Sequence, residues 1–406
     1  MQIVVFYQYF STPNGRWSTR FYHLAKHWTK RGHQVTVVTS VYDKSDLDEL
    51  LGTHRRKRGW VRHLEVEGIR LVVLAIPISN RQSFSRRIAS FLCYALLSCW
   101  FALRLPADLV IASSGPITVG LPALVARLVR RRRLVFECRD LWPEGAIALG
   151  ALRNPLLTVP AFGLARACYR AASLVVTLSR DMADHLRGRF AVDRLAVVPN
   201  GVDLQAFADS ESPAPAPSWL GDRQVLLYTG NLGPTNGSAL IETCARRLEE
   251  LGETRFLLVL LGEGPARASL QRLAEDLDTL VVLGPRPKRE VVFWLRRALA
   301  ALVPLADAPI LATSSPNKLF EALAAGVPVI QTTDGWIAEL LADHRCGYTV
   351  PPQDPDAVIE ALRRLADDPE ARRAAGRRAR TLAREQFDLE KLADRYLASL
   401  HEAYGS

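Results

Sequence analysis

The sequence predicts an α/β protein made of two doubly wound, parallel-sheet domains. Its 406 residues, of which 49% are hydrophobic, exceed the length of one ordinary domain and can bury a large core. Short apolar runs rich in β-branched residues alternate with amphipathic segments, which is the pattern of a parallel sheet wrapped by helices. This alternation stops at residues 209–222, which are rich in proline and serine, and then restarts. We therefore expect two domains joined by a linker.

The expected strands form one group on each side of this linker. The first group comprises residues 3–7, 35–39, 69–76, 108–112, 134–137, 174–178 and 195–199, and the second comprises residues 225–230, 256–262, 280–284, 299–305 and 327–332. We place an N-terminal domain at residues 1–205, a C-terminal domain at 206–385 and a last helix at 386–406 that crosses back to the first domain. The arginine- and alanine-rich residues 361–386 are typical of an exposed amphipathic helix. In doubly wound folds, ligands bind at the carboxyl ends of the strands.

Charge is distributed unevenly between the two halves of the chain. Residues 1–200 contain 29 Lys and Arg against 13 Asp and Glu, a net charge of +16, whereas residues 201–406 contain 23 against 29, a net charge of −6. The basic residues gather at 54–59, 86–87 and 127–133. The first domain is therefore expected to attract a polyanion or an anionic membrane surface. The alternative is a solvated, arginine-rich surface without a partner.

Residues 88–103, IASFLCYALLSCWFAL, contain no charged residue and are flanked by arginines. The run is shorter than the roughly 20 apolar residues of a membrane span. On a helix, bulky apolar side chains cover most of the surface, and Ser90, Tyr94 and Ser98 form a narrow polar stripe. We expect a helix near 86–104 that lies in the membrane interface; a fully buried core helix is the alternative.

The cysteines and the N-terminal residues bear on where the protein works. The six cysteines form no Cys-x-x-Cys pair and no Cys/His cluster with zinc spacing, which favours a reducing compartment and no structural metal. The chain starts with a strand-like run rather than a signal peptide, so we expect no export. The expected location is the cytoplasm, peripheral on the inner face of the cell membrane.

The segment ATSSPNKLFEALAAGVPVI, residues 312–330, predicts an anion site. Ser314 and Ser315 are expected to cap a helix with Pro316 in its first turn, whose unpaired amides can seat a phosphate. Lys318 adds a positive charge there, and Glu321 lies on the same side about 4.5 Å further along the axis. A carboxylate can accept two hydrogen bonds from a ribose diol. The pair therefore matches a nucleoside diphosphate; an ordinary i, i+3 ion pair is the alternative.

Glycine-rich turns follow two strands of the second domain. GNLGPTNG begins at Gly230 and GEGP at Gly262, and each would let backbone amides approach an anion. A dinucleotide fingerprint would need glycine where Arg267 stands, and no phosphate-binding loop of the Gly-x-x-x-x-Gly-Lys-Ser/Thr type occurs. A hydride-transferring dehydrogenase and a P-loop nucleotidase are therefore disfavoured.

In the first domain, two segments follow strands at the expected ligand edge. Gly15 lies in a loop, STPNGRWSTR, that is expected to be flexible enough to pass close to a sugar phosphate, with Arg16 beside it. Arg139, Asp140 and Glu144 follow the strand at 134–137, where charged residues favour a ligand role, although Asp140 could instead cap a helix. The Asp-x-Asp patterns do not directly end a strand, so a metal-dependent sugar-nucleotide site is unsupported.

Together these motifs resemble the GT-B glycosyltransferases, specifically the retaining family 4. The resemblance rests on residues 24–40, 197–207, 261–270 and 315–330. It implies two Rossmann-like domains, a UDP-sugar donor held mainly by the C-terminal domain, an acceptor held by the N-terminal domain, and no metal or other cofactor. RDLWPE with SSPNKLFEALAAG is similar to a branch that builds bacterial surface polysaccharides, including N-acetylfucosamine transferases. That similarity implies transfer of an N-acetylated hexosamine or deoxyhexosamine to a lipid-linked saccharide, as in O-antigen or capsule synthesis.

The expected site residues carry over onto this chain as follows. The expected catalytic residues are Lys318, Asp140 and Arg139. Donor binding is expected from Glu321, Asn317, Ser315, Pro316, Gly230, Asn231, Gly233, Gly262, Gly264 and Arg286, and acceptor binding from Gly15, Arg16 and Glu144.

The chain departs from the family pattern at several positions. Thr313 stands where many members have a first glutamate, and Asn231 and Asn236 stand where many have Arg and Lys. We expect Lys318 and Arg139 to supply the missing positive charge.

Two other classes of function remain open at this point. A sugar-nucleotide epimerase or phosphorylase can share the two-domain architecture but would need no acceptor. The basic first half could instead mark a nucleic-acid-binding module, but its basic runs lack interleaved aromatic residues, so we expect no nucleic-acid partner.

Overall fold

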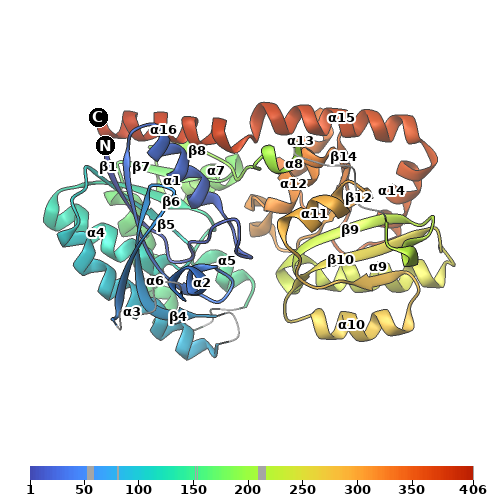
Figure 1. The fold of residues 1–406 in the computed structure, drawn as a ribbon, viewed down its shortest axis with the longest axis horizontal. Helices are drawn as coiled ribbons and strands as arrows, with labels where there is room; N and C mark the ends of the chain where they lie inside the picture. The colour runs from blue at the N-terminus through green and yellow to red at the C-terminus, as the bar shows by residue number, and fades with distance from the viewer. Residues whose placement is uncertain (53–58, 80–81, 151, 153, 209–215, 406) are drawn as a thin grey trace. The chain divides into compact units, whose positions relative to one another are not determined.

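The computed structural model describes residues 1–52, 59–79, 82–150, 152, 154–208 and 216–405. The chain divides into unit 1, Met1–Pro199 with Leu389–Ser406, and unit 2, Asn200–Asp388. Each unit is a sheet covered by helices (Figure 1). The units divide after Pro199, slightly before the predicted boundary at 205. Nearly all of the basic run at 54–59 and half of the proline-rich stretch at 209–222 lie outside the described residues.

Unit 1 contains an eight-stranded sheet in the order β3-β4-β2-β1-β5-β6-β7-β8. Its strands are β1 Gln2–Phe6, β2 Gln34–Tyr42, β3 Val61–Val66, β4 Ile69–Ile78, β5 Leu109–Ser113, β6 Arg133–Cys138, β7 Leu174–Thr177 and β8 Leu195–Val197. All neighbours are parallel except β3 and β4, which are antiparallel. The predicted sheet was wholly parallel, and β3 was not predicted, because its alternating polar residues make it a half-exposed edge strand.

Helices cover both faces of this sheet. They are α1 Arg20–Lys30, α2 Leu47–Gly52, α3 Phe84–Arg104, α4 Gly120–Arg130, α5 Glu144–Ala148, α6 Pro155–Ala171, α7 Arg180–Phe190 and α16 Leu389–Gly405. Val135 packs in one cluster with side chains of α1 and α16, whereas the next residue, Phe136, packs on Tyr169 of α6. Successive side chains of a strand point to opposite faces, so α6 lies on the other face, where α4 packs against α3 and α6.

The last helix, α16, is part of unit 1 although it follows unit 2 in the sequence. Trp28 of α1 donates its indole N–H to the carbonyl of Ala393 at 3.1 Å and packs edge-on against Tyr396. His27 Nε2 lies 2.7 Å from Asp394 Oδ1. These contacts anchor the end of the chain on the outer face of α1.

Unit 2 contains a six-stranded parallel sheet in the order β11-β10-β9-β12-β13-β14. Its strands are β9 Gln224–Asn231, β10 Phe256–Glu263, β11 Leu280–Val282, β12 Ala298–Val303, β13 Val329–Gln331 and β14 Gly347–Thr349. Its helices are α8 Gln205–Ala208, α9 Ser238–Glu250, α10 Arg267–Asp276, α11 Lys288–Leu295, α12 Asn317–Ala325, α13 Trp336–His344, α14 Pro355–Asp367 and α15 Pro369–Gln386. The sheet order reverses at β9, so a switch point lies between β9 and β12.

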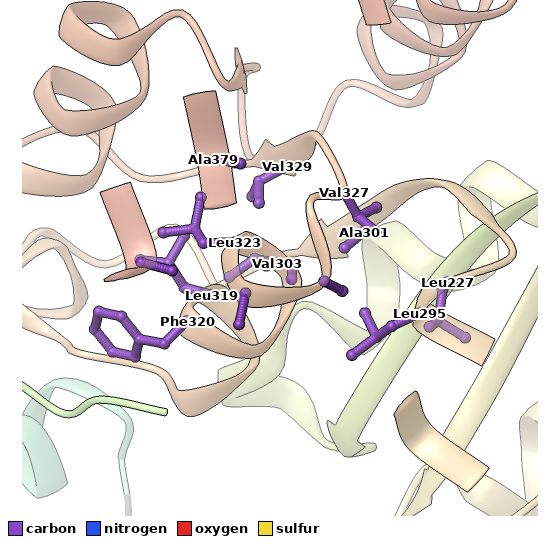
Figure 2. Packing of buried hydrophobic residues seen from close by; sticks show 14 of the residues in the cluster. Leu227, Leu295, Ala301, Val303, Leu319, Phe320, Leu323, Val327, Val329 and Ala379 are labelled. Atoms are coloured by element: carbon purple, nitrogen blue, oxygen red, sulfur yellow. The ribbon is translucent and has the colours of Figure 1, made fainter. Parts of the chain in front are cut away.

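Buried side chains alternate between two layers of helices in unit 2. Leu227, Val303 and Val329 face a layer that includes α11, α12 and α15 (Figure 2), whereas Leu226 and Leu302 face α9, α10 and α14. In Figure 2, Leu319, Phe320 and Leu323 of α12 lie in the first layer. Burial of these apolar side chains fixes how α12 is rotated, and leaves Lys318 and Glu321 on its less buried side.

Residues 361–386 were predicted to form one exposed amphipathic helix, but they belong to two helices, α14 and α15. Asp368 ends α14 and caps α15, because its side chain accepts a hydrogen bond from the Ala371 N–H at 2.9 Å. The alanine-rich face of α15 is buried: Ala375, Ala379 and Ala383 pack towards α12. Small residues allow this close approach of the two helices.

Candidate functional site

The amino end of α12 differs in detail from the predicted serine cap. Pro316 occupies the N-cap position, and no described side chain caps the helix. Ser315 is buried, and its hydroxyl oxygen instead accepts the Asn200 N–H at 3.3 Å, while its carbonyl oxygen accepts the Asn200 side-chain amide at 2.7 Å. Ser315 therefore holds the loop before the helix. In the first turn, the Leu319 N–H donates to the Pro316 carbonyl at 3.1 Å, whereas no acceptor among the described residues binds the N–H groups of exposed Asn317 and of Lys318 at the positive end of the dipole.

Lys318 lies in this first turn and reaches the carboxyl end of β9. Its Nζ donates to the Tyr228 hydroxyl at 3.2 Å and to the Asn236 side-chain oxygen at 3.1 Å, and lies 4.2 Å from the centre of the Tyr228 ring. Tyr228 in turn donates to the carbonyl of Asn231 at 2.6 Å. Within the described residues, no carboxylate forms an ion pair with Lys318. Both of its hydrogen-bond acceptors are neutral.

The surroundings of Lys318 disfavour its charge. Desolvation of the buried ammonium group lowers the pKa of Lys318 from its usual 10.5 to about 7, and the negative charge of nearby Glu321 opposes this shift only in part. A cation held by neutral oxygen atoms gains more from an incoming anion than a cation that is already paired. The predicted catalytic lysine is therefore placed to bind a negatively charged group.

Glu321 lies one turn further along α12 and is paired with a different lysine. Its carboxylate forms an ion pair with Lys288, at the start of α11, and its side chain is 22% exposed. The alternative of an i, i+3 pair with Lys318 is therefore wrong. Lys288 occupies part of the hydrogen-bonding capacity that was predicted for a ribose diol, and a bound diol would share Glu321 with it.

The predicted glycines at the carboxyl ends of β9 and β10 serve mainly to bring the two strands together, and Gly230 and Gly262 lie within these strands rather than in turns after them. A Cβ atom at Gly262 would lie 1.9 Å from the carbonyl oxygen of Gly230, and one at Gly264 would lie 2.2 Å from that of Leu232. The Gly262 N–H donates to the Gly284 carbonyl, so it is not available to an anion, contrary to the prediction. A Cβ atom at Gly233 would lie 3.1 Å from Asn231 Nδ2.

Gly230 differs from these glycines because it also borders Lys318. Its φ of 129° lies in the region that favours glycine, and an added Cβ would lie 3.4 Å from Lys318 Cε. Gly230 thus keeps the space around the lysine open. Of the predicted glycines of unit 2, it is the one that the structure brings next to the predicted cation.

Arg286 lies two residues before Lys288, which pairs with Glu321, but forms no described hydrogen bond or ion pair with Lys318 or Glu321. It lines a hollow of about 500 Å³ along α11, together with Trp219, Phe293 and other residues, and its Nε lies 3.7 Å from Glu290. Neither Lys318 nor Glu321 lines this hollow. A role of Arg286 in donor binding stays a prediction.

In unit 1, the loop that contains Gly15 is pinned rather than flexible, contrary to the prediction. Buried Asp46 accepts hydrogen bonds from the Thr12 N–H at 3.0 Å and from the Thr12 hydroxyl. A Cβ atom at Gly15 would lie 2.1 Å from Ser11 Oγ and 3.1 Å from the Asp46 backbone nitrogen, so a larger residue would have to displace its neighbours. Arg16 follows as an exposed side chain, and its N–H donates to the Lys44 carbonyl at 2.7 Å.

Arg139 follows β6 and bonds to residues near the end of β1. Its guanidinium donates to the Tyr7 hydroxyl and, at 3.1 Å, to Ser18 Oγ, and its carbon Cζ lies 5.2 Å from the centre of the Tyr7 ring. Burial works against its charge, but Tyr7, Glu137 and Asp140 outweigh this effect and raise the pKa of Arg139. Asp140 is exposed beside it. The two predicted catalytic residues of unit 1 thus lie together at the carboxyl edge of the sheet.

Glu144, which was predicted to bind the acceptor, is held by residues of α7 through one of its carboxylate oxygens. It begins α5, and its Oε1 accepts from Arg189 Nε at 3.0 Å and lies 3.4 Å from His185 Nε2, both on α7. Its side chain is mostly buried. These contacts connect α5 to α7. The other carboxylate oxygen, Oε2, is buried without a hydrogen-bond partner among the described residues, so acceptor binding by Glu144 stays a prediction.

Three residues of the unit 2 site were missed or given no role by the sequence analysis. Tyr228 and Asn236 hold Lys318, and Lys288 holds Glu321. A tyrosine near the end of an otherwise aliphatic strand, with its polar tip at the ligand edge, was the available signal for Tyr228. Within the described residues, no group of three or more His, Cys, Asp or Glu side chains lies close enough to hold a metal ion.

This arrangement has a definite chemical capacity. The uncapped amides of α12 and the Lys318 ammonium can bind a phosphate or diphosphate, and Glu321 can accept hydrogen bonds from hydroxyl groups a few ångströms away. The nucleotide part of a sugar nucleotide offers both kinds of group.

Comparison with known families matches both units of the chain to glycosyltransferase domains. Residues 17–201 match the family model described as "Glycosyl transferase 4-like domain", and residues 223–368 match "Glycosyl transferases group 1". The first match covers most of unit 1 and extends to residue 201, just inside unit 2, and the second match lies wholly within unit 2.

Individual proteins are similar to this chain over part of its sequence or over the whole fold. D-inositol 3-phosphate glycosyltransferase of Streptomyces avermitilis is 31% identical over 52% of this chain and 47% of the relative. The putative colanic acid biosynthesis glycosyltransferase WcaL of Escherichia coli is 30% identical over 52% of each chain. The chain thus spans about half the length of the curated relatives it matches. The crystal structure of Anabaena HepE with UDP-glucose covers 99% of this chain and 100% of its own, with 16% identity and a TM-score of 0.68, which shows a shared GT-B fold.

Proposed function

Because this chain belongs to the GT-B glycosyltransferases, we propose that it transfers a sugar from a UDP-sugar to a lipid-linked saccharide, with retention at the anomeric carbon. The observation that carries the donor proposal is Lys318, whose charge faces two neutral acceptors and no described carboxylate partner, beside the uncapped end of α12. Such a site gains stabilisation from a diphosphate. HepE was solved with UDP-glucose in the same fold, which supports a nucleotide-sugar donor here.

We propose that Lys318 and the α12 amides stabilise the departing diphosphate. Breaking the bond between the anomeric carbon and the phosphate oxygen builds negative charge on the diphosphate, where preorganised donors are most effective. The acceptor hydroxyl attacks the same face of the sugar, and its proton passes to the departing phosphate oxygen. In this scheme the chain needs no metal or other cofactor, because the lysine and the amides supply the positive charge.

Glu321 is proposed to accept the ribose hydroxyls, sharing its carboxylate with Lys288. Arg139 and Asp140 are proposed to contact the acceptor side of the reaction, because they lie at the carboxyl edge of unit 1. For the sugar we propose an N-acetylated hexosamine or deoxyhexosamine in bacterial surface-polysaccharide synthesis. Similarity of RDLWPE and SSPNKLFEALAAG to that branch, and the match to the colanic acid transferase, support this choice.

Product analysis tests this proposal. Purified protein is incubated with a panel of UDP- and GDP-sugars, with and without a polyprenyl-diphosphate saccharide, and the products are identified by mass spectrometry. We expect one UDP-sugar to extend the acceptor by one residue and release UDP. Conversion of the donor without acceptor would instead identify an epimerase, and release of a sugar phosphate in the presence of inorganic phosphate would identify a phosphorylase.

A further inference from the structure

Helix α3 buries two of the three residues of its polar stripe, together with apolar residues such as Phe91, and exposes bulky apolar side chains on its opposite side. Tyr94 and Ser98 are fully buried, and the Tyr94 hydroxyl donates to the carbonyl of Val38 in β2 at 2.7 Å. On the opposite side, Leu96 is 65% and Trp100 is 56% exposed. A surface helix of a water-soluble protein has the reverse arrangement, with its apolar stripe towards the core. The outer side of α3 is therefore suited to a non-aqueous partner.

Two neighbouring helices continue this arrangement. Helix α4 packs against both α3 and α6. Leu128 of α4 is 73% exposed and Leu156 of α6 is 81% exposed. We call the exposed apolar residues of these three helices the apolar face; they are Phe84, Leu92, Leu96, Leu97, Trp100, Leu128, Val129, Leu156 and Val159. Isolated exposed apolar residues are common in proteins, but this many on three adjacent helices mark an interaction surface.

The charges of these helices are all positive. Helices α3, α4 and α6 contain no Asp or Glu, and their basic residues are Arg86, Arg87, Arg104, Arg127, Arg130, Arg166 and Arg170. The guanidinium of Arg104 lies 4.3 Å from the centre of the Trp100 ring, at the end of α3. Tryptophan and arginine side chains combine an apolar part with a polar end, and both favour the boundary between lipid tails and headgroups. The positive charge of these arginines favours a negatively charged partner.

The packing of α3 indicates how it would meet a bilayer. By length and composition α3 could cross a membrane, and it is the one described helix for which this holds. It packs along β2, β4 and α4 of unit 1, however, and Tyr94 hydrogen-bonds to the sheet. A helix held against a sheet on one side can enter a bilayer only with its other side. It would lie in the plane of the interface, as amphipathic helices do.

We propose that the apolar face of unit 1 docks the protein on the surface of a bilayer that contains anionic lipids. The leucine and tryptophan side chains enter the boundary between headgroups and acyl chains, and the arginines contact lipid phosphates. The protein is then peripheral on the inner, cytoplasmic side of the membrane, where a lipid-linked acceptor is within reach. The docking itself goes beyond the proposed reaction and does not depend on which sugar is transferred.

Vesicle flotation of the whole protein tests the docking. We expect binding to phosphatidylcholine vesicles that contain phosphatidylglycerol, and weaker binding to pure phosphatidylcholine or at high salt. The double variant L96E/W100E, which alters exposed side chains, should bind about tenfold or more weakly, because it removes two apolar groups from the bilayer. The matched control is L251E, at an exposed leucine of unit 2, which should bind as the wild type does.

Other outcomes would overturn the proposal. Wild-type protein that stays in solution with anionic vesicles, or L96E/W100E protein that floats as the wild type does, contradicts it. Light scattering that shows a dimer dissociated by L96E/W100E, without vesicle binding, would assign the apolar face to a second copy of the chain. Circular dichroism checks that both variants are folded. Vesicle binding is measured without donor or acceptor, so its failure is distinct from failure of the proposed transfer reaction.

Discussion

Each unit places one cation on the ring of a tyrosine at the carboxyl edge of its sheet. In unit 1, Arg139 lies over Tyr7 and donates to its hydroxyl; in unit 2, Lys318 lies over Tyr228 and donates to its hydroxyl. The difference is in the negative charge nearby. Tyr7, Glu137 and Asp140 raise the pKa of Arg139, whereas desolvation lowers the pKa of Lys318 to about 7. The carboxylate nearest in sequence to Lys318, that of Glu321, is paired with Lys288.

The two cations therefore differ in how much each would gain from a bound anion. Tyr7, Glu137 and Asp140 favour the charged form of Arg139, although Glu137 is itself paired with Arg20, and the hydrogen bonds of Arg139 to Tyr7 and Ser18 stabilise the edge of unit 1. Lys318 lacks such compensation, so binding of an anion stabilises its charged form. The proposed donor site is therefore in unit 2, and four experiments test this difference between the two cations.

The largest effect is expected for Lys318→Ala. Removal of one donor to the departing diphosphate should lower kcat by about 10²–10³-fold, because such donors act mainly on the transition state. Steady-state kinetics with saturating donor measures this loss. The matched control is Arg377→Ala, which removes an exposed positive charge from α15. If both variants keep wild-type turnover, Lys318 does not stabilise the leaving group.

Glu321→Gln should have the next largest effect, on donor binding. Hydrogen bonds to a charged group contribute about 1.5–3 kcal/mol, which corresponds to a rise of about 10–100-fold in the KM for the donor. The effect should be much smaller with a 2′-deoxyuridine donor, because one of the two hydroxyl partners is already absent. Lys288→Ala is the comparison variant, since it frees Glu321 from its ion pair. Equal losses with both donors would show that Glu321 does not contact the ribose.

Arg139→Ala should act on stability rather than on donor binding. Loss of its hydrogen bonds to Tyr7 and Ser18 should lower the free energy of unfolding by about 1–3 kcal/mol, measured by urea denaturation. UDP affinity, measured by calorimetry, should stay unchanged. A large loss of UDP affinity with normal stability would reverse the contrast between the two cations.

The smallest effect is a pH dependence that belongs to Lys318. A bound diphosphate favours the protonated lysine, so donor binding takes up a proton; the KM for the donor should rise as pH increases through about 7, by up to about tenfold per unit. Since the folded-state pKa lies below the usual 10.5, the unliganded protein should gain stability as pH rises from about 7 towards 10.5. Lys318→Arg, which stays charged, should flatten the KM profile. An unchanged profile in that variant would assign the titration to another group.

Lys318 and Glu321 could be predicted as site residues because their types and spacing are unusual within an apolar helix. Predictions for single side chains were wrong or incomplete where a residue distant in sequence forms the hydrogen bond. The Ser315 hydroxyl, which was expected to cap α12, instead accepts a hydrogen bond from the Asn200 N–H. The loop that contains Gly15 was expected to be flexible, but Asp46 accepts a hydrogen bond from its Thr12 N–H. Glu144 is held by residues of α7, which its position after β6 did not predict.

The fold class, the two-domain organisation and the helix that carries Lys318 and Glu321 could be predicted, because they depend on local patterns of apolar and polar residues. Which polar groups are already hydrogen-bonded, and which remain available to a ligand, depends on contacts between distant parts of the chain. The tertiary structure placed Tyr228 and Asn236 around Lys318, gave Glu321 to Lys288, and turned most of the polar stripe of α3 inward. Hydrogen bonding and burial depend on which residues meet in space, and local sequence patterns do not specify those meetings.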